Sequence, residues 1–187
     1  MVLENWKRRT IIKETFPLLT ALAAVGVISG LILEAYKKTL IQYPQLLLLI
    51  PVMIGMGGNL GAILASRTST ALHLGIIELT PKNKALRNNI IATIILATII
   101  FTLTGILTHP ISQILNIGNQ LSITQITLIS LTSGIIISLI TIALTIISTY
   151  LSYTHGLDPD NTVLPIVTSL SDIAGILIFY LTALYFI

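Results

Sequence analysis

Long apolar stretches alternate along the chain with short clusters of charge. Asn88–Leu157 is a run of 70 residues without Asp, Glu, Lys or Arg, and Thr15–Leu33 and Thr39–Ser66 are shorter runs of the same kind. The last stretch, Asn161–Ile187, contains one charged residue, Asp172. About 20 apolar residues cross a bilayer core as a helix. The pattern therefore predicts an all-α integral membrane protein with five transmembrane helices, at about 15–36, 42–66, 88–108, 121–150 and 161–187.

A transmembrane β-barrel is the other architecture that satisfies the backbone inside a bilayer. Its strands would alternate polar and apolar residues. The run Ile90–Leu96 does not alternate. Charged residues make up 9% of the chain and the mean hydropathy is +0.95, which excludes a soluble globule and a disordered chain. The absence of cysteine excludes disulfides and thiolate metal sites.

The distribution of Lys and Arg predicts the orientation. Eight of the ten basic residues lie in the N-terminal tail or around the connection between the second and third spans, namely Lys7, Arg8, Arg9, Lys13, Arg67, Lys82, Lys84 and Arg87. Lys37 and Lys38 fall on the opposite side. We expect a cytoplasmic N-terminus, an external C-terminus and a multi-pass protein of the cell membrane in contact with lipids. The basic pI reflects these membrane ends, so nucleic acid is not expected as a partner.

Residues 1–187 are interpreted as a single transmembrane domain, because the longest predicted non-spanning stretch is the loop of roughly 67–87. An alternative for the first segment is a cleaved signal peptide, since Ala21–Ala24 looks like a processing site. Four spans would remain in that case.

Asp172 is the leading candidate for a functional residue. It lies 11 residues into the last span, and no Lys or Arg follows Arg87. An ionisable group within a span is costly unless it is paired or solvated. Asp172 is therefore either a buried carboxyl kept neutral or a carboxylate balanced by a cation that moves.

The second predicted span contains an unusual proline and glycine stretch, from Pro51 to Gly61. We expect it to interrupt the helix and expose carbonyl groups, or to let helices pack closely through Gly57 and Gly58. The last span has a similar arrangement, because Pro51 precedes Asn59 by eight residues and Pro165 precedes Asp172 by seven. Paired interrupted helices indicate a transport site near the midplane.

All candidate ligands at such a site are oxygen atoms, which suits hard cations such as Mg²⁺ and Ca²⁺. His73, His109 and His155 are predicted in loops, so a histidine site within the membrane is not expected. One carboxylate per chain is few for a divalent ion. Because Mg²⁺ keeps several of its waters, one Asp from each subunit of a homodimer could hold a hydrated ion on the symmetry axis.

Two sequence blocks resemble the MgtE family of divalent cation transporters. The first is Pro51–Gly75, with Gly-Met-Gly-Gly-Asn-Leu-Gly followed by Leu-Ala-Ser-Arg from Leu64, and the second joins Asp158–Asn161 to Pro165–Gly175. The Leu-Ala-Ser-Arg stretch looks most like the solute-carrier magnesium transporters of animals. The resemblance covers essentially the whole chain.

The resemblance implies a dimeric Mg²⁺ channel or transporter with a pore between its subunits. Asp172 matches the pore aspartate of the family, Asn59 matches the asparagine after the paired glycines, and a carbonyl one turn earlier falls on Thr168. Ser169 belongs to the same block and is a further pore candidate. Ala62 and Ile63 depart from the bacterial pattern, and the cytoplasmic sensing domain of many bacterial members has no counterpart in this sequence.

Three charged residues are candidates for the inner mouth. Asp158 and Asp160 are interpreted first as solvated residues at a helix start, with the collection of cations as the alternative. Arg67 is interpreted as a snorkelling anchor, or as a partner that pairs with one of these acids and holds the mouth shut.

Divalent cation transport, with Mg²⁺ as the transported ion, is thus the favoured function, and no cofactor is expected. An exchanger coupled to Na⁺ or H⁺ is the first alternative, although no second embedded ionisable group is evident. A membrane enzyme acting on lipid phosphates would need several clustered carboxylates or a His/Ser pair. An accessory subunit without a site of its own is the third possibility.

Overall fold

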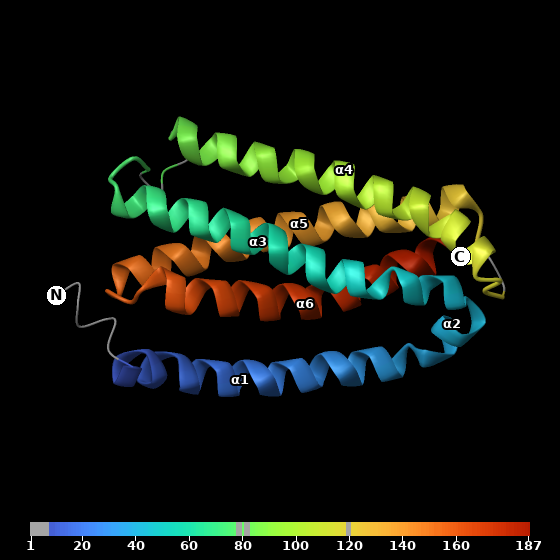
Figure 1. The fold of residues 1–187 in the computed structure, drawn as a ribbon, viewed down its shortest axis with the longest axis horizontal. Helices are drawn as coiled ribbons and strands as arrows, with labels where there is room; N and C mark the ends of the chain where they lie inside the picture. The colour runs from blue at the N-terminus through green and yellow to red at the C-terminus, as the bar shows by residue number, and fades with distance from the viewer. Residues whose placement is uncertain (1–7, 78–79, 81–82, 119–120) are drawn as a thin grey trace.

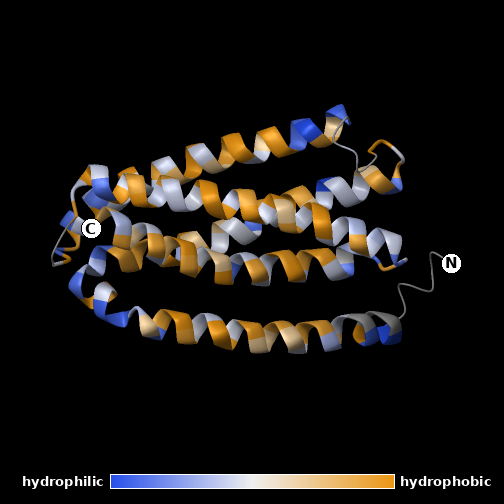
Figure 2. Cartoon of the chain, turned by 180° about the vertical axis from the view of Figure 1, so that it is seen from behind, coloured by the Kyte–Doolittle hydropathy of each residue, from blue (hydrophilic) through white to orange (hydrophobic). Residues whose placement is uncertain are grey.

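The computed structural model describes residues 8–77, 80, 83–118 and 121–187, apart from the side chains of residues 10, 11, 14 and 160. These residues form an all-helical protein. Its elements are α1 (Arg8–Ala35), α2 (Lys37–Gln42), the 3₁₀ helix η1 (Pro44–Leu48), α3 (Ile50–His73), α4 (Lys84–Ile114), α5 (Ile123–Thr154) and α6 (Pro159–Phe186). Five of the helices in the described ranges are long and apolar enough to cross a membrane, which confirms the predicted fold class. Figure 2 shows mainly hydrophobic residues along these helices and hydrophilic residues towards the two ends of the bundle.

The helix starts follow from local sequence. The Asn83 side chain accepts hydrogen bonds from the backbone N–H groups of Ala85 and Leu86 at the start of α4. Ser122 and Gln125 form a reciprocal capping box at the start of α5. Gly75 and Gly156 follow the ends of α3 and α5 with φ of +68°, the left-handed conformation that commonly terminates helices.

The glycine stretch in the second span does not interrupt it, contrary to the predicted break. Helix α3 continues unbroken through these glycines, from Ile50 to His73. The predicted span of 42–66 differs only at its start, where the chain forms the short 3₁₀ helix η1 before α3 begins. Pro51 lies in the first turn of α3, where a proline has no hydrogen bond to lose. The alternative interpretation of this stretch, close helix packing, is the one that the structure supports.

Helix α6 lies at the centre of the bundle and packs against α1, α3 and α5, while α4 packs on α5 and α3 at the side remote from α1. Helices α3 and α6 run in opposite directions (Figure 1), as expected. The start of α1, the end of α3 and the start of α4 share one end of the bundle. The same end of the bundle therefore holds Arg8, Arg67, Lys84 and Arg87. Helix α2, with Lys37 and Lys38, lies at the other end. The orientation in the membrane stays a prediction.

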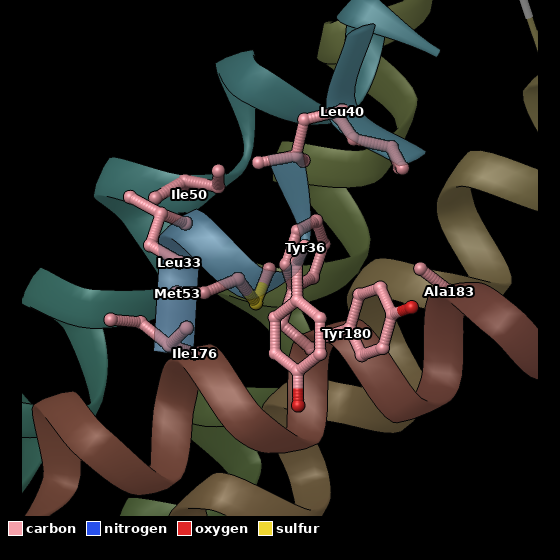
Figure 3. A pocket seen from close by; sticks show the side chains of 10 residues that line it. Leu33, Tyr36, Leu40, Ile50, Met53, Ile176, Tyr180 and Ala183 are labelled. Carbon is pink, nitrogen blue, oxygen red and sulfur yellow. The ribbon is translucent and has the colours of Figure 1, made fainter. Parts of the chain in front are cut away.

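Helix α1 is attached to the bundle mainly through α6. The Tyr36 ring, directly after α1, stacks on Tyr180 of α6 with centroids 3.3 Å apart and planes 13° apart. Figure 3 shows these two rings beside a small cavity of about 10 Å³, whose other walls include Leu33, Met53 and Ile176. The wall has no polar surface, so the cavity is a packing gap rather than a place for an ion.

Candidate cation pathway along α3 and α6

Small residues bring α3 and α6 into close contact at the middle of the bundle. A Cβ added at Gly58 would lie 3.5 Å from Thr168, and one added at Gly57 would lie 3.6 Å from the Cβ of Ser171. Farther along α6, Gly175 packs on the Met53 carbonyl, which a Cβ would approach to 2.9 Å. The glycines of the Pro51–Gly61 stretch thus allow α6 to pack closely against α3, and these contacts fix the register between the two helices.

Ser171 faces the inside of the helix bundle. Its hydroxyl shares a hydrogen bond of 2.8 Å with Thr141 of α5, and both side chains are fully buried. Gly57 and Gly61 face the same part of α5, since an added Cβ at either would contact Thr141. Gly57, Gly61 and Ser171 therefore mark the faces of α3 and α6 that contact α5. The other faces of these two helices are directed away from α5.

Asp172 follows Ser171, so its side chain is turned by about 100° away from the face that contacts α5. It is only partly buried, and it lies one turn after Thr168, on the same side of α6. Within the described part of the chain, no hydrogen-bond or ion-pair partner lies beside the Asp172 carboxylate. Two carboxylate oxygens at mid-span are thus available to a ligand.

Thr168 and Ser169 complete the oxygen-bearing turn before Asp172. Helix α6 is continuous here, so the Thr168 carbonyl belongs to the helical ladder. The Thr168 hydroxyl donates to the carbonyls of Leu164 and Pro165 at 2.9 and 3.1 Å, which leaves its oxygen lone pairs as acceptors. Pro165 lies within α6 and lacks an N–H, so one helical hydrogen bond is missing from the turn preceding this cluster.

Asn59 is exposed at the middle of α3. It lies two positions after Gly57, about 200° around the helix, and therefore points away from α5. With Pro51, Gly55 and Thr104 it lines an open groove of about 400 Å³ between α3 and α4. Among the described residues its amide has no hydrogen-bond partner. An unpaired amide at this depth is costly against lipid.

The candidates for the inner mouth do not join this cluster. Asp158 precedes α6 by one residue and is about 21 Å along the helix from Asp172 at 1.5 Å per residue. The Asp160 side chain lies outside the described residues. The Nε atom of Arg67 donates to Oδ1 of Asn89 on α4 at 2.9 Å, so Arg67 is directed towards α4 and not towards the start of α6.

The side chains near the ends of the helices differ partly from expectation. His109 lies within α4, not in a loop, because that helix continues to Ile114. His73 is the last residue of α3, and His155 follows the end of α5. Glu34 pairs with Lys37 at 3.0 Å near the end of α1. Within the described ranges, no three His, Asp or Glu residues are grouped to hold a metal ion.

Two polar features of the structure are not predicted by the sequence pattern. Gln45 of η1 is fully buried, its amide donating to Ser112 at 2.8 Å and its oxygen accepting from the N–H of Leu121 at 2.8 Å. Ser and Thr residues also recur on the buried face of α5, including Ser130, Thr141, Thr145 and Ser152. The i, i+4 spacing of Thr141 and Thr145 could have suggested an inward face, but nothing local marked Gln45.

Comparison with known proteins identifies the family. Residues 50–182 match the MgtE family, described as divalent cation transporters. Solute carrier family 41 member 3 of Mus musculus is 29% identical over 177 aligned residues, which cover 86% of this chain and 35% of that protein. The Rattus norvegicus protein of the same name is also 29% identical and is covered to 37%. The chain thus spans about a third of the length of these curated relatives.

The match extends from the first turn of α3 almost to the end of α6 and includes both blocks that suggested the resemblance. It confirms that resemblance and indicates a transporter rather than an enzyme. Together with the five apolar helices, it makes this a multi-pass membrane protein. The chain belongs to the MgtE family of divalent cation transporters.

Proposed function

We propose that this chain transports a divalent cation, with Mg²⁺ as its principal cargo, across the cell membrane, and that Asp172 is the main carboxylate on the path. The observation that carries the proposal is the situation of Asp172 itself. It is a half-buried carboxylate at mid-span, with no cationic side chain beside it in the described structure. A mobile cation would supply the missing charge.

The oxygen atoms near Asp172 suit a partly hydrated Mg²⁺. Thr168 and Ser169 belong to the preceding turn, and Gly58 places Asn59 of α3 close to the height of Thr168. Because Mg²⁺ binds oxygen and gives up its waters reluctantly, a small number of protein oxygens and a shell of water can hold it. Ca²⁺, Mn²⁺ and Co²⁺ are competitors whose relative flux would define the selectivity.

A homodimer supplies what one protomer lacks. The single chain brings one carboxylate to mid-span, which is few for a divalent ion. The outward face of α3 carries Asn59 beside Pro51 and Gly55, and a second copy would cover this amide and let backbones approach. The path then lies between two α3–α6 pairs, with Asp172 contributed by each subunit.

A passive pathway is favoured over coupled exchange. A coupled Na⁺ or H⁺ site would call for a second ionisable group deep in a span, and Asp172 is the one acid of the sequence at such a depth. Asp158 and Asp160 remain candidates for collecting cations at the inner mouth.

The decisive experiment is Mg²⁺ entry into liposomes that contain the purified protein and an internal Mg²⁺-sensitive dye. We expect Asp172→Asn to lose most of the flux, because this change keeps the size of the side chain and removes its charge. Asp172→Glu should retain part of the flux. Glu34→Gln, an exposed carboxylate paired with Lys37, is the matched control and should transport like wild type.

Each variant is first shown to fold by its elution volume and melting temperature in detergent. Absence of Mg²⁺ entry with the wild-type protein would refute the transport proposal. Near-normal flux in Asp172→Asn would refute the role of the carboxylate charge.

A further inference from the structure

An open pocket with polar and apolar lining residues lies between α3 and α4 at the end of the bundle where the basic residues gather, well away from Asp172. Its volume is about 500 Å³. Its polar lining consists of Ser66, Arg67, Thr70, Asn88 and Asn89, and its apolar lining includes Leu74 and Ile76. The transport proposal makes no use of this pocket.

The guanidinium of Arg67 is held in a defined position within the pocket. Its Nε donates to Asn89 Oδ1 across the α3–α4 interface at 2.9 Å. This bond orients the plane of the guanidinium and leaves the terminal nitrogens as donors. Paired terminal donors match the oxygens of a phosphate group, which Arg binds in a bidentate manner.

The charge of the pocket is not neutralised by its described lining. Arg67 is exposed, and the lining residues that the structure describes include no carboxylate. The neighbouring Asn88 amide and the hydroxyls of Ser66 and Thr70 are further hydrogen-bond donors. A net-negative group with several acceptor oxygens is therefore the complementary ligand.

The apolar part of the lining indicates where that group comes from. Leu74 and Ile76 are 67% and 60% exposed beside the polar residues, and α3 and α4 are both spanning helices. A free anion would leave these side chains uncovered, whereas a phospholipid would cover them with its glycerol and the start of its acyl chains. Lys84, at the start of α4, adds positive charge at the same level of the bundle.

We propose that this pocket, defined by Arg67, Asn88 and Asn89, is a binding site for the headgroup of an acidic phospholipid. Arg67 binds the phosphate through its terminal nitrogens, and Asn89 is a positioning residue that orients the guanidinium. The lipid bridges α3 and α4, which contact each other less extensively than either contacts α5.

The test uses the purified full chain in a neutral detergent, freed of endogenous lipid and titrated with phosphatidylglycerol, phosphatidylcholine or inorganic phosphate. Bound lipid is counted by native mass spectrometry. We expect saturable binding of phosphatidylglycerol and at least about tenfold weaker binding of phosphatidylcholine, because the choline cation of phosphatidylcholine offsets the charge of its phosphate and is repelled by Arg67. Arg67→Gln should weaken phosphatidylglycerol binding by about tenfold as well.

Arg87→Gln is the matched control, since it removes the same charge at the same end but lies outside the pocket lining. It should change the affinity by less than about twofold. Arg67→Lys keeps the charge but lacks the Nε donor and the planar fork, so we expect it to bind more weakly than wild type. It serves as the second variant if Arg67→Gln does not fold.

Equal weakening by Arg67→Gln and Arg87→Gln would overturn the proposal in favour of unspecific attraction to the basic end. Competition by millimolar inorganic phosphate at the affinity of the lipid would assign the site to a free anion instead. Equal binding by Arg67→Lys and wild type would refute the role of the guanidinium. None of these outcomes depends on whether the protein transports Mg²⁺.

Discussion

The hydroxyl groups of Thr141 and Ser171 share a buried hydrogen bond of 2.8 Å between α5 and α6. Ser171 is the residue directly before Asp172, so this bond limits the rotation of α6 about its own axis. With Ser171 held against α5, Asp172 must present its carboxylate to another side. The direction of the carboxylate proposed to bind the cation is therefore determined by a contact that it does not itself make.

Loss of this bond should reduce both stability and transport. We expect Thr141→Val to lower the free energy of unfolding by about 1–2 kcal/mol, because the Ser171 hydroxyl is left buried without its partner. Mg²⁺ flux should fall as well, since α6 is less well fixed. Thr98→Val is the control, because the Thr98 hydroxyl is exposed and bonds only within α4. Equal unfolding free energies for the two variants would contradict this role of the hydrogen bond.

Close packing at Gly61 should make even one methyl group harmful. A Cβ at this position would collide with Val167 of α6 and approach Thr141 of α5 to 2.5 Å. We expect Gly61→Ala to lower the free energy of unfolding by about 1–3 kcal/mol. Gly26→Ala in α1, where nothing lies within 4 Å of the added Cβ, should be neutral or slightly stabilising because alanine favours helix. Thermal unfolding in detergent measures both, and a neutral Gly61→Ala would show that this contact is loose.

Gln45 should be essential to the end of the bundle that holds η1. Its side chain donates to the Ser112 hydroxyl and accepts from the Leu121 N–H, so Gln45→Leu leaves the buried Leu121 N–H without this acceptor, whereas Ser112 keeps its bond to the His109 carbonyl. We expect a loss of about 1–3 kcal/mol in unfolding free energy. Gln113→Leu, which removes an exposed amide bonded to the His109 ring, should cost far less. Indistinguishable melting temperatures would refute the importance of this link.

The proposed dimer can be tested with single cysteines, because the natural sequence contains none. Gly55→Cys places a thiol on the outward face of α3, in a position where its Cβ meets nothing within 4 Å. We expect mild oxidation in membranes to give a disulfide-linked dimer. Ile95→Cys on the exposed face of α4 is the control and should stay monomeric on a denaturing gel. A dimer band in both variants, or in neither, would count against the proposed interface.

The role of the proline and glycine stretch could be predicted only in part from the sequence. Its composition was compatible with a broken helix and with close packing, because glycine serves both. Which of the two applies depends on the residues that pack against these glycines. Those residues are Thr168 and Ser171, which belong to a segment more than a hundred residues away in the chain. Arg67 is a similar case, because its charge predicted a place near the membrane surface but its partner Asn89 belongs to the next helix.

The sequence by itself determined that this chain has five segments long and apolar enough to cross a membrane and that one carboxylate, Asp172, lies near the middle of the last of them. Both conclusions depend only on the length and polarity of single segments, because these two properties decide whether a segment can cross the bilayer core. The tertiary structure decided that α3 is unbroken, that Ser171 faces inward while Asp172 does not, and that Gln45 is buried. Which face of a helix is covered depends on the neighbours packed against it, and that information is distributed over several distant segments of the chain.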